Sequence, residues 1–176
     1  MRGTRELVHV LQATANRLAA GNKYTWTHMG RCNCGHLAQT VTALPPGEIH
    51  ALALEKRGDW RDHAIEYCPD SGYPIDHIIT QLLELGLSTD ELAHLERLSD
   101  PRVLARLPPE RRHLQHKRRE DVVLYLRTWA AALHAHLDTT EPLSQASAGP
   151  AAANRASPRG DAAHPLTTPP RRRAAA

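Results

Sequence analysis

The chain has 176 residues, of which 41% are hydrophobic and 23% charged, a composition typical of one soluble domain rather than a membrane protein. Aromatic residues make up 4% and phenylalanine is absent, which favours a core of aliphatic side chains on helices. No stretch reaches the roughly 20 consecutive apolar residues of a membrane span, and the first residues lack the pattern of a secretory signal. We therefore expect no membrane association and a cytoplasmic location, where thiols stay reduced.

The formal net charge of +3 lies entirely in the C-terminal region. Residues 139–176 hold five arginines and two acidic residues, whereas residues 1–138 hold equal numbers of basic and acidic residues. A neutral body is a poor electrostatic footprint for nucleic acid, so we expect only weak contacts through Arg171, Arg172 and Arg173. A protein partner is left open.

The first half of the chain carries two kinds of helix signal, capping residues and apolar spacing. Thr4 precedes a stripe at intervals of three and four, which predicts a helix over 5–20 that Gly21 ends. Leu37, Val41 and Leu44 mark a short helix that Pro45 and Pro46 must end. The next short helix is expected over 47–56.

The second half contains the clearest helix start. Ser88 and Glu91 form a capping box. A buried helix precedes it and closes at Gly86, and Asp100-Pro101 opens one more turn. The last predicted helix has an apolar stripe made of Val123, Leu126, Ala130, Leu133 and Leu137.

These signals predict an all-α fold, a small irregular bundle of about five to seven helices with loops at 22–35 and 56–75. The helical domain is expected over 1–138. The remainder, 139–176, is rich in Pro, Ala and Arg without apolar periodicity, and is predicted to be a disordered tail.

All three cysteines fall in the two predicted loops. Cys32 and Cys34 share the first loop and Cys68 lies in the second. Cysteines used for packing prefer the buried faces of regular elements, so their place in turns favours a site. Two thiolates one residue apart can converge on one ion, and Cys68 with a histidine would complete a Cys3His set. The fourth ligand is expected to be His28, with His77 and His36 as alternatives.

The preferred function is a binding or regulatory module in which a structural zinc ion ties the two loops together. Three cysteines and one histidine are also the ligands of the CDGSH iron–sulfur proteins, and the order Cys32, Cys34, Cys68, His77 is similar, although the spacing differs. That similarity keeps a [2Fe–2S] cluster as an alternative to zinc.

A thiol-based redox protein or enzyme is the alternative function. Cys34 opens a predicted helix, where the helix dipole favours thiolate. Whether the protein is an enzyme is left open.

Two other segments allow either a functional or a structural interpretation. The aromatic segment before the cysteines can line a pocket, but Trp26 is more simply expected to cover the core. The basic run over 110–119 can contact phosphate, but a solvated connector is favoured.

Overall fold

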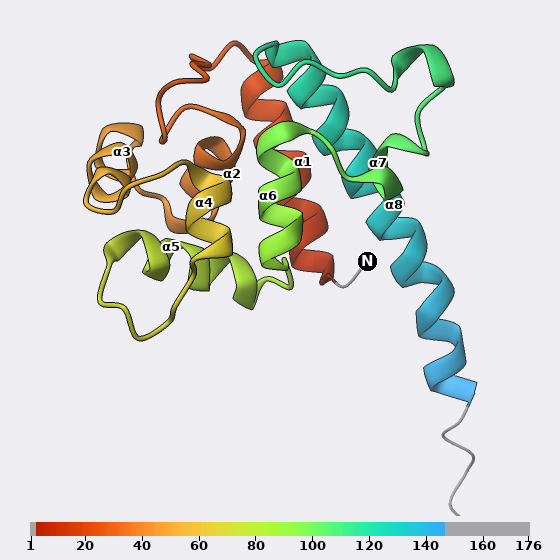
Figure 1. Ribbon diagram of the computed structural model, residues 1–176. Coiled ribbons are helices and arrows are strands. Elements are labelled where there is room, and N and C mark those ends of the chain that lie inside the picture. The colour runs from red at the N-terminus through yellow and green to blue at the C-terminus, as the bar shows by residue number, and fades with distance from the viewer. Residues whose placement is uncertain (1–2, 147–176) are drawn as a thin grey trace, which may run out of the picture.

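The computed structural model describes residues 3–146, and the side chains of residues 3–140. Within this part all the regular secondary structure is helical, and there is no strand (Figure 1). The elements are α1 (Arg5–Ala19), α2 (Asn33–Thr42), α3 (Pro46–Leu54), α4 (Trp60–Ile65), α5 (Pro74–Glu84), α6 (Thr89–Arg97), α7 (Pro101–Leu104), a 3-10 turn η1 (Pro109–Arg111) and α8 (Arg119–Ala146). The all-α prediction is confirmed, with more helices than the five to seven expected.

The helix ends follow local capping chemistry. The Thr4 hydroxyl accepts a hydrogen bond from the amide of Leu7 at the start of α1, as predicted. Ser88 and Glu91 form the expected reciprocal capping box at the start of α6. Gly21 and Gly86 follow α1 and α5 with φ of 99° and 95°, a backbone conformation that glycine adopts without strain.

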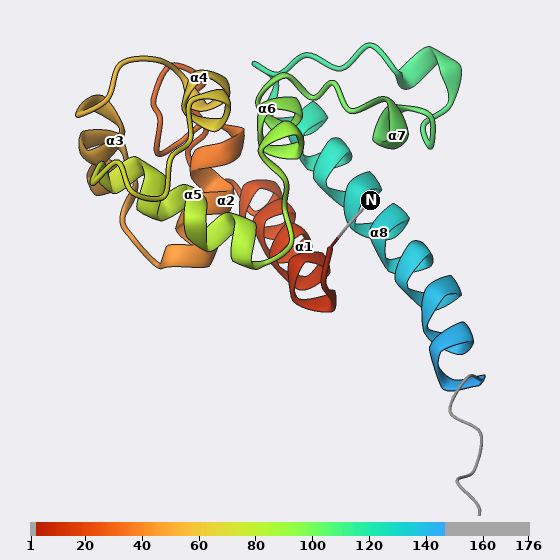
Figure 2. The same ribbon diagram turned by 60° about the horizontal axis from the view of Figure 1, so that its bottom comes forward.

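The helices form two groups, α1 with α8 on one side and α3 to α6 on the other, and α2 contacts both groups. The long helix α8 runs beside α1 and extends beyond the rest of the helices (Figures 1 and 2). On the other side, α2 contacts α1, α3, α5 and α6, and α4 packs against α6. The buried hydrophobic side chains are mainly aliphatic, and the largest of them are the rings of Trp60, Tyr125 and Trp129. None of the helices in the described part combines the length and apolar character that a membrane span needs.

The structure differs from the sequence prediction at three boundaries. The segment 56–75, expected to be a loop, contains the six-residue helix α4, which begins with a capping box between Asp59 and Asp62. Helix α2 begins at Asn33, inside the first predicted loop. Helix α8 continues to Ala146, and residues 147–176 of the predicted tail lie outside the described residues.

Candidate functional site

The motif between Met29 and His36 lies where the loop at 22–32 packs tightly against α2 and α3. A Cβ atom on Gly35 would lie 2.1 Å from the carbonyl oxygen of Met29, and one on Gly30 would lie 2.0 Å from that of Pro46. Both distances are far shorter than a van der Waals contact, so the close approach of the backbones requires glycine at both positions.

A buried asparagine joins the start of α2 to the neighbouring elements. Asn33 is fully buried, and its side-chain amide donates to the carbonyl oxygens of Leu95 and Glu96 at distances of 2.9 and 2.8 Å. Its oxygen accepts a hydrogen bond from Tyr24. Every polar group of this side chain thus has a partner, which fixes the start of α2 against the end of α6.

The three cysteines do not converge. The Cys32 thiol donates to the carbonyl oxygen of Met29 in the loop, and the Cys34 thiol faces that of Leu92 on α6, at 3.4 and 3.7 Å. Both are buried, whereas Cys68 is exposed, and all three are free thiols. The two adjacent cysteines therefore fill the core, in contrast to the ligand role predicted for them.

The predicted fourth ligand, His28, is also in the wrong state for a metal. Its Nδ1 accepts a hydrogen bond from the amide of Gly30 at 3.2 Å, so the neutral ring carries its proton on Nε2. Histidines that bind a metal through one nitrogen donate a proton from the other. His50, whose ring centroid lies 4.1 Å from that of His28, accepts from the amide of Met29 in the same way.

The predicted metal-binding function is wrong for the described residues. Among residues 3–140, no three or more His, Cys, Asp or Glu side chains are grouped so that they could hold a metal ion. Of the alternative ligands, His77 is exposed on α5, and the Nε2 of buried His36 bonds to the carbonyl oxygen of Lys23 at 3.2 Å. The sulfur atoms of Cys32 and Cys34 lie against separate carbonyl groups, as expected for side chains placed by packing.

The geometry also opposes the thiol-based alternative. Cys34 lies in the first turn of α2 and is fully buried. Burial, with smaller contributions from the negative charges around it, raises the pKa of its thiol well above the usual range. The helix dipole is too weak to offset this desolvation, so Cys34 remains a protonated packing residue.

A cationic pocket opens beside the same motif, between the loop at 22–32 and α2. Its volume is about 190 Å³. The lining residues include two cations and a histidine, and they include no acidic residue: Asn22, Lys23, Arg31, His36, Gln39 and Pro46. The side chains of Lys23 and Arg31 have no ion pair or hydrogen bond with any other described residue. Two uncompensated cations therefore share one small concave site.

His36 contributes a polar group whose bonding is incomplete. The residue is only 2% exposed, its Nε2 bonds to the Lys23 carbonyl, and its buried Nδ1 has no hydrogen-bond partner among the described residues. Burial lowers the pKa of His36, and the charges of Arg17 and Arg31 lower it further. Burial and these two positive charges both favour the neutral imidazole.

The positive surroundings extend beyond the pocket itself. Arg17 of α1 donates to Thr40 and Gln39 on α2, at 2.9 and 2.7 Å, and so lies behind the pocket wall. The pKa of His28 is lowered by burial and then by the charges of His50, Arg31 and Lys23. Every charge identified as acting on His28 and His36 is therefore cationic.

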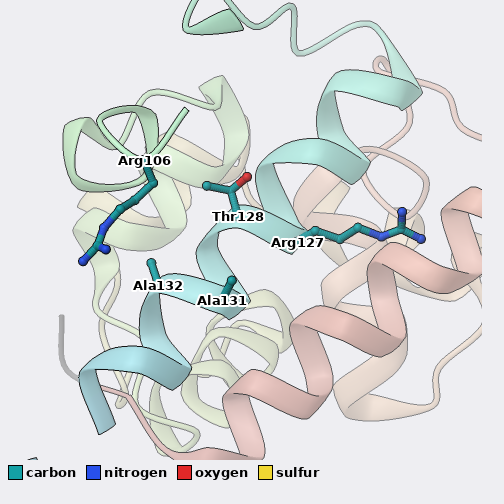
Figure 3. Close-up of a pocket in the computed structure, with 5 residues that line it drawn as sticks. All are labelled: Arg106, Arg127, Thr128, Ala131 and Ala132. Carbon is teal, nitrogen blue, oxygen red and sulfur yellow. The ribbon is translucent and has the colours of Figure 1, made fainter. Parts of the chain in front are cut away.

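A second pocket, of about 380 Å³, lies on α8 and is a weaker candidate. Its lining combines Arg106 and Arg127 with Thr128, Ala131 and Ala132. Figure 3 shows the two arginine side chains extending away from each other on opposite sides of this surface. Arg127 also donates to Asn16 on α1 at 3.3 Å. The polar groups do not converge there, as they do in specific ligand sites.

The sequence contains a signal for the cationic pocket that the motif-based interpretation missed. Between Glu6 and Glu48 there is no acidic residue, although this stretch contains Arg17, Lys23 and Arg31. So long an acid-free interval in a chain whose first 138 residues balance in charge indicates a local positive surface.

Comparisons of this chain with protein-family models, with curated proteins and with solved structures find no match.

Proposed function

We propose that this protein binds an anionic ligand in the pocket between the loop at 22–32 and α2, through a phosphate or sulfate-like oxyanion group. The observation that carries the proposal is the pairing of Lys23 and Arg31 around one acid-free cavity, with no partner for either cation in the described structure. Cations that face each other without a counter-charge repel, and an anion between them removes that cost.

The chemistry of the lining fits an oxyanion. Arginine presents a planar fork of donors that matches phosphate and carboxylate groups, and lysine adds a compact positive charge. The side-chain amides of Asn22 and Gln39 supply further polar groups at the rim. Hydrogen bonds to a charged group contribute about 1.5–3 kcal/mol each, so two or three of them are enough for measurable affinity.

The size of the cavity limits the part of the ligand that it holds. Pockets for drug-sized molecules have volumes of about 300–1,000 Å³, and this one has about 190 Å³. One tetrahedral group fits better than a whole cofactor. The lining contains no hydroxyl, thiol or carboxylate side chain that could act as a nucleophile, which supports binding in preference to covalent catalysis at this site.

The proposed setting is the cytoplasm. Phosphorylated ligands are abundant there, and the three free thiols are compatible with its reducing conditions.

The test is a calorimetric titration of the full-length protein with inorganic phosphate, sulfate and acetate at constant ionic strength. We expect phosphate and sulfate to bind one site, and Arg31→Gln or Lys23→Gln to weaken that binding about tenfold or more, as the loss of a charge-assisted hydrogen bond predicts. Neither side chain holds the fold together, so both variants should remain folded.

The matched control is Arg57→Gln. Arg57 is exposed and lies outside the pocket, and its substitution removes the same single positive charge. Equal weakening by Arg57→Gln and Arg31→Gln would show that only the overall charge matters. Absence of phosphate and sulfate binding to the wild-type protein would refute the proposal.

A further inference from the structure

The loop at 22–32 connects the cationic pocket to the basic segment that precedes α8. The Tyr24 hydroxyl shares its one proton between the Asn33 side-chain oxygen and the carbonyl oxygen of His116. The ring of Trp26 lies 4.1 Å from that of His116, and the Arg97 guanidinium lies 5.6 Å from the Trp26 ring centroid. Figure 1 shows the loop after α1 and the segment before α8 beside each other at the top of the view. Residues far apart in sequence thereby form one surface.

This surface, defined as the loop at 22–32 with residues 111–119, is strongly positive. The basic segment contributes five cations and no acidic residue: Arg111, Arg112, Lys117, Arg118 and Arg119. The side chains of Lys117 and Arg118 make no ion pair within the described structure. Burial lowers the pKa of His116, and the charges of Arg97 and Lys117 lower it further, so the positive environment of His28 and His36 continues here.

We propose that this surface binds the phosphodiester backbone of a nucleic acid, and that the pocket of Lys23 and Arg31 holds one of its phosphate groups. The inference rests on the proposed oxyanion site and extends it to a polymeric ligand. Arg119 pairs with Glu120, but among the described residues no ion pair is formed by Lys117 and Arg118 on one segment or by Lys23 and Arg31 on the other. Cations on two adjoining segments match the repeated charge of a strand, and their binding releases the counterions condensed on it. Backbone contacts of this kind carry affinity without base specificity.

The apolar surface argues for a nucleic acid over an anionic membrane. Peripheral membrane segments insert apolar side chains beside their basic ones. The large hydrophobic residues exposed in the described part are Leu54, Ile65 and Tyr73, which belong to α3, α4 and the start of α5. None lies on the basic surface, where Trp26 is half-buried between His116 and Arg97.

The neutral overall charge of residues 1–138 conceals this arrangement. The acid-free stretch from residue 7 to residue 47 and the acid-free run from 111 to 119 come together in space. Acidic residues flank the second run, where Asp121 accepts a hydrogen bond from the Gln115 amide and Glu120 pairs with Arg119, but none lies within either stretch. Electrostatic attraction of a polyanion depends on the local surface and not on the total.

The experiment measures binding of the full-length protein to a fluorescent 20-nucleotide single strand, to the matching duplex and to vesicles containing phosphatidylglycerol, over a range of salt concentrations. We expect an oligonucleotide affinity that falls steeply with salt. Lys117→Glu should weaken it about tenfold, and Lys117→Gln should lower the slope of log K against log salt by about 1, because one phosphate contact is lost.

Three comparisons separate this inference from its rivals. Arg57→Glu carries the same charge reversal outside the surface and should leave the affinity within about twofold, since salt screens exposed charges that do not contact the strand. A variant with alanine at positions 171, 172 and 173 should retain the Lys117 effect. Binding that depends on those three arginines and not on Lys117, or binding to vesicles but to neither nucleic acid, would overturn the inference.

Sulfate distinguishes failure of the inference from failure of the proposed function. Lys117→Glu should leave sulfate affinity near the wild-type value, whereas Arg31→Gln should weaken both sulfate and oligonucleotide binding. Sulfate binding without oligonucleotide binding refutes only the surface. If Arg31→Gln does not change oligonucleotide binding, then the pocket does not hold a phosphate of the strand, and the inference is refuted.

Discussion

At the scale of single residues, Gly35 sets the distance between α2 and the preceding loop. A methyl group there would lie 2.1 Å from the Met29 carbonyl oxygen and 2.5 Å from the carbonyl carbon of Gly30. Both contacts are with backbone, which cannot move aside as a flexible side chain can. We expect Gly35→Ala to lower the free energy of unfolding by about 3 kcal/mol or more, at the upper end of overpacking effects, as measured by urea denaturation.

Gly47 provides the matched control for this prediction. It lies in α3, and a Cβ atom added there would meet nothing within 4 Å. Gly47→Ala should therefore raise the free energy of unfolding by about 0.5–1 kcal/mol through better helix propensity. A Gly35→Ala variant as stable as the wild type would mean that the loop does not press on α2 as described.

The cysteines show why residue types alone misled the prediction. Their spacing is compatible with a metal site, but sequence does not reveal which way a thiol points when a loop turns into a helix. Cys32 remains at the N-cap and Cys34 enters the first turn, and the two sulfurs reach carbonyl groups of different elements. The need for glycine at position 35 comes from the close approach of two backbone segments, which no local sequence pattern predicts.

At the scale of elements, the contact between α4 and α6 contains a carboxyl group that holds a proton near neutral pH. Glu96 is buried, and its Oε2 accepts a hydrogen bond from the amide of Arg61 at 2.8 Å. Burial, followed by the negative charge of Asp59, raises the pKa of Glu96 to about 7. Asp59 itself pairs with Arg97 at 3.1 Å.

Glu96→Gln should remove a pH-dependent loss of stability. The unfolded chain ionises Glu96 near its ordinary pKa of about 4.3, while the native state keeps it protonated up to about 7. Stability therefore falls as pH rises through this window and stays lower above it. Glutamine keeps the oxygen acceptor without the charge.

We expect Glu96→Gln to match the wild type near pH 4 and to exceed its unfolding free energy by up to about 3 kcal/mol near pH 8, from about 1.4 kcal/mol per pKa unit. Urea denaturation of both proteins at several pH values is the measurement. Glu84→Gln, at the exposed end of α5, is the control for loss of a carboxyl group. A stability difference for Glu96→Gln that does not change with pH would show that burial does not favour the protonated carboxyl group.

Element prediction succeeded where signals are local and failed where they are short. The caps at Thr4 and Ser88 were found because the side chain and the amide that it bonds lie three residues apart. Helix α4 was missed because six residues are too few to show an apolar period, and its burial depends on packing against α6. Contacts between elements, including the one at Glu96, are outside the reach of such patterns.

At the scale of the whole molecule, the fold brings cations from α1 and the loop at 22–32 around the two histidines His28 and His36. Burial and these charges lower the pKa of both rings. An anion in the pocket offsets Arg17, Lys23 and Arg31, so it favours protonation of His36, which lines the pocket and whose Nδ1 has no partner among the described residues. Ligand binding and proton uptake are then linked, and each linked proton strengthens binding up to about tenfold per pH unit.

Sulfate is the appropriate probe because its charge, unlike that of phosphate, does not change near neutral pH. We expect the increase in Tm produced by sulfate, relative to chloride at equal ionic strength, to be larger at about pH 5.5 than at about pH 7.5, since the histidines titrate below about 6.5. His36→Gln should reduce this difference between the two pH values, and Arg31→Gln should reduce the sulfate effect at both.

The comparison with chloride also controls for two general effects on the whole fold. Sulfate stabilises proteins by exclusion from their surface, and this contribution should persist in Arg31→Gln. Acid destabilises the native state through buried His63, which faces Lys56, Asp59, Asp62 and Asp76 and has a lowered pKa. That loss occurs with either salt and cancels in the difference. A sulfate effect that does not change with pH would show that His28 and His36 take up no proton when the pocket is filled.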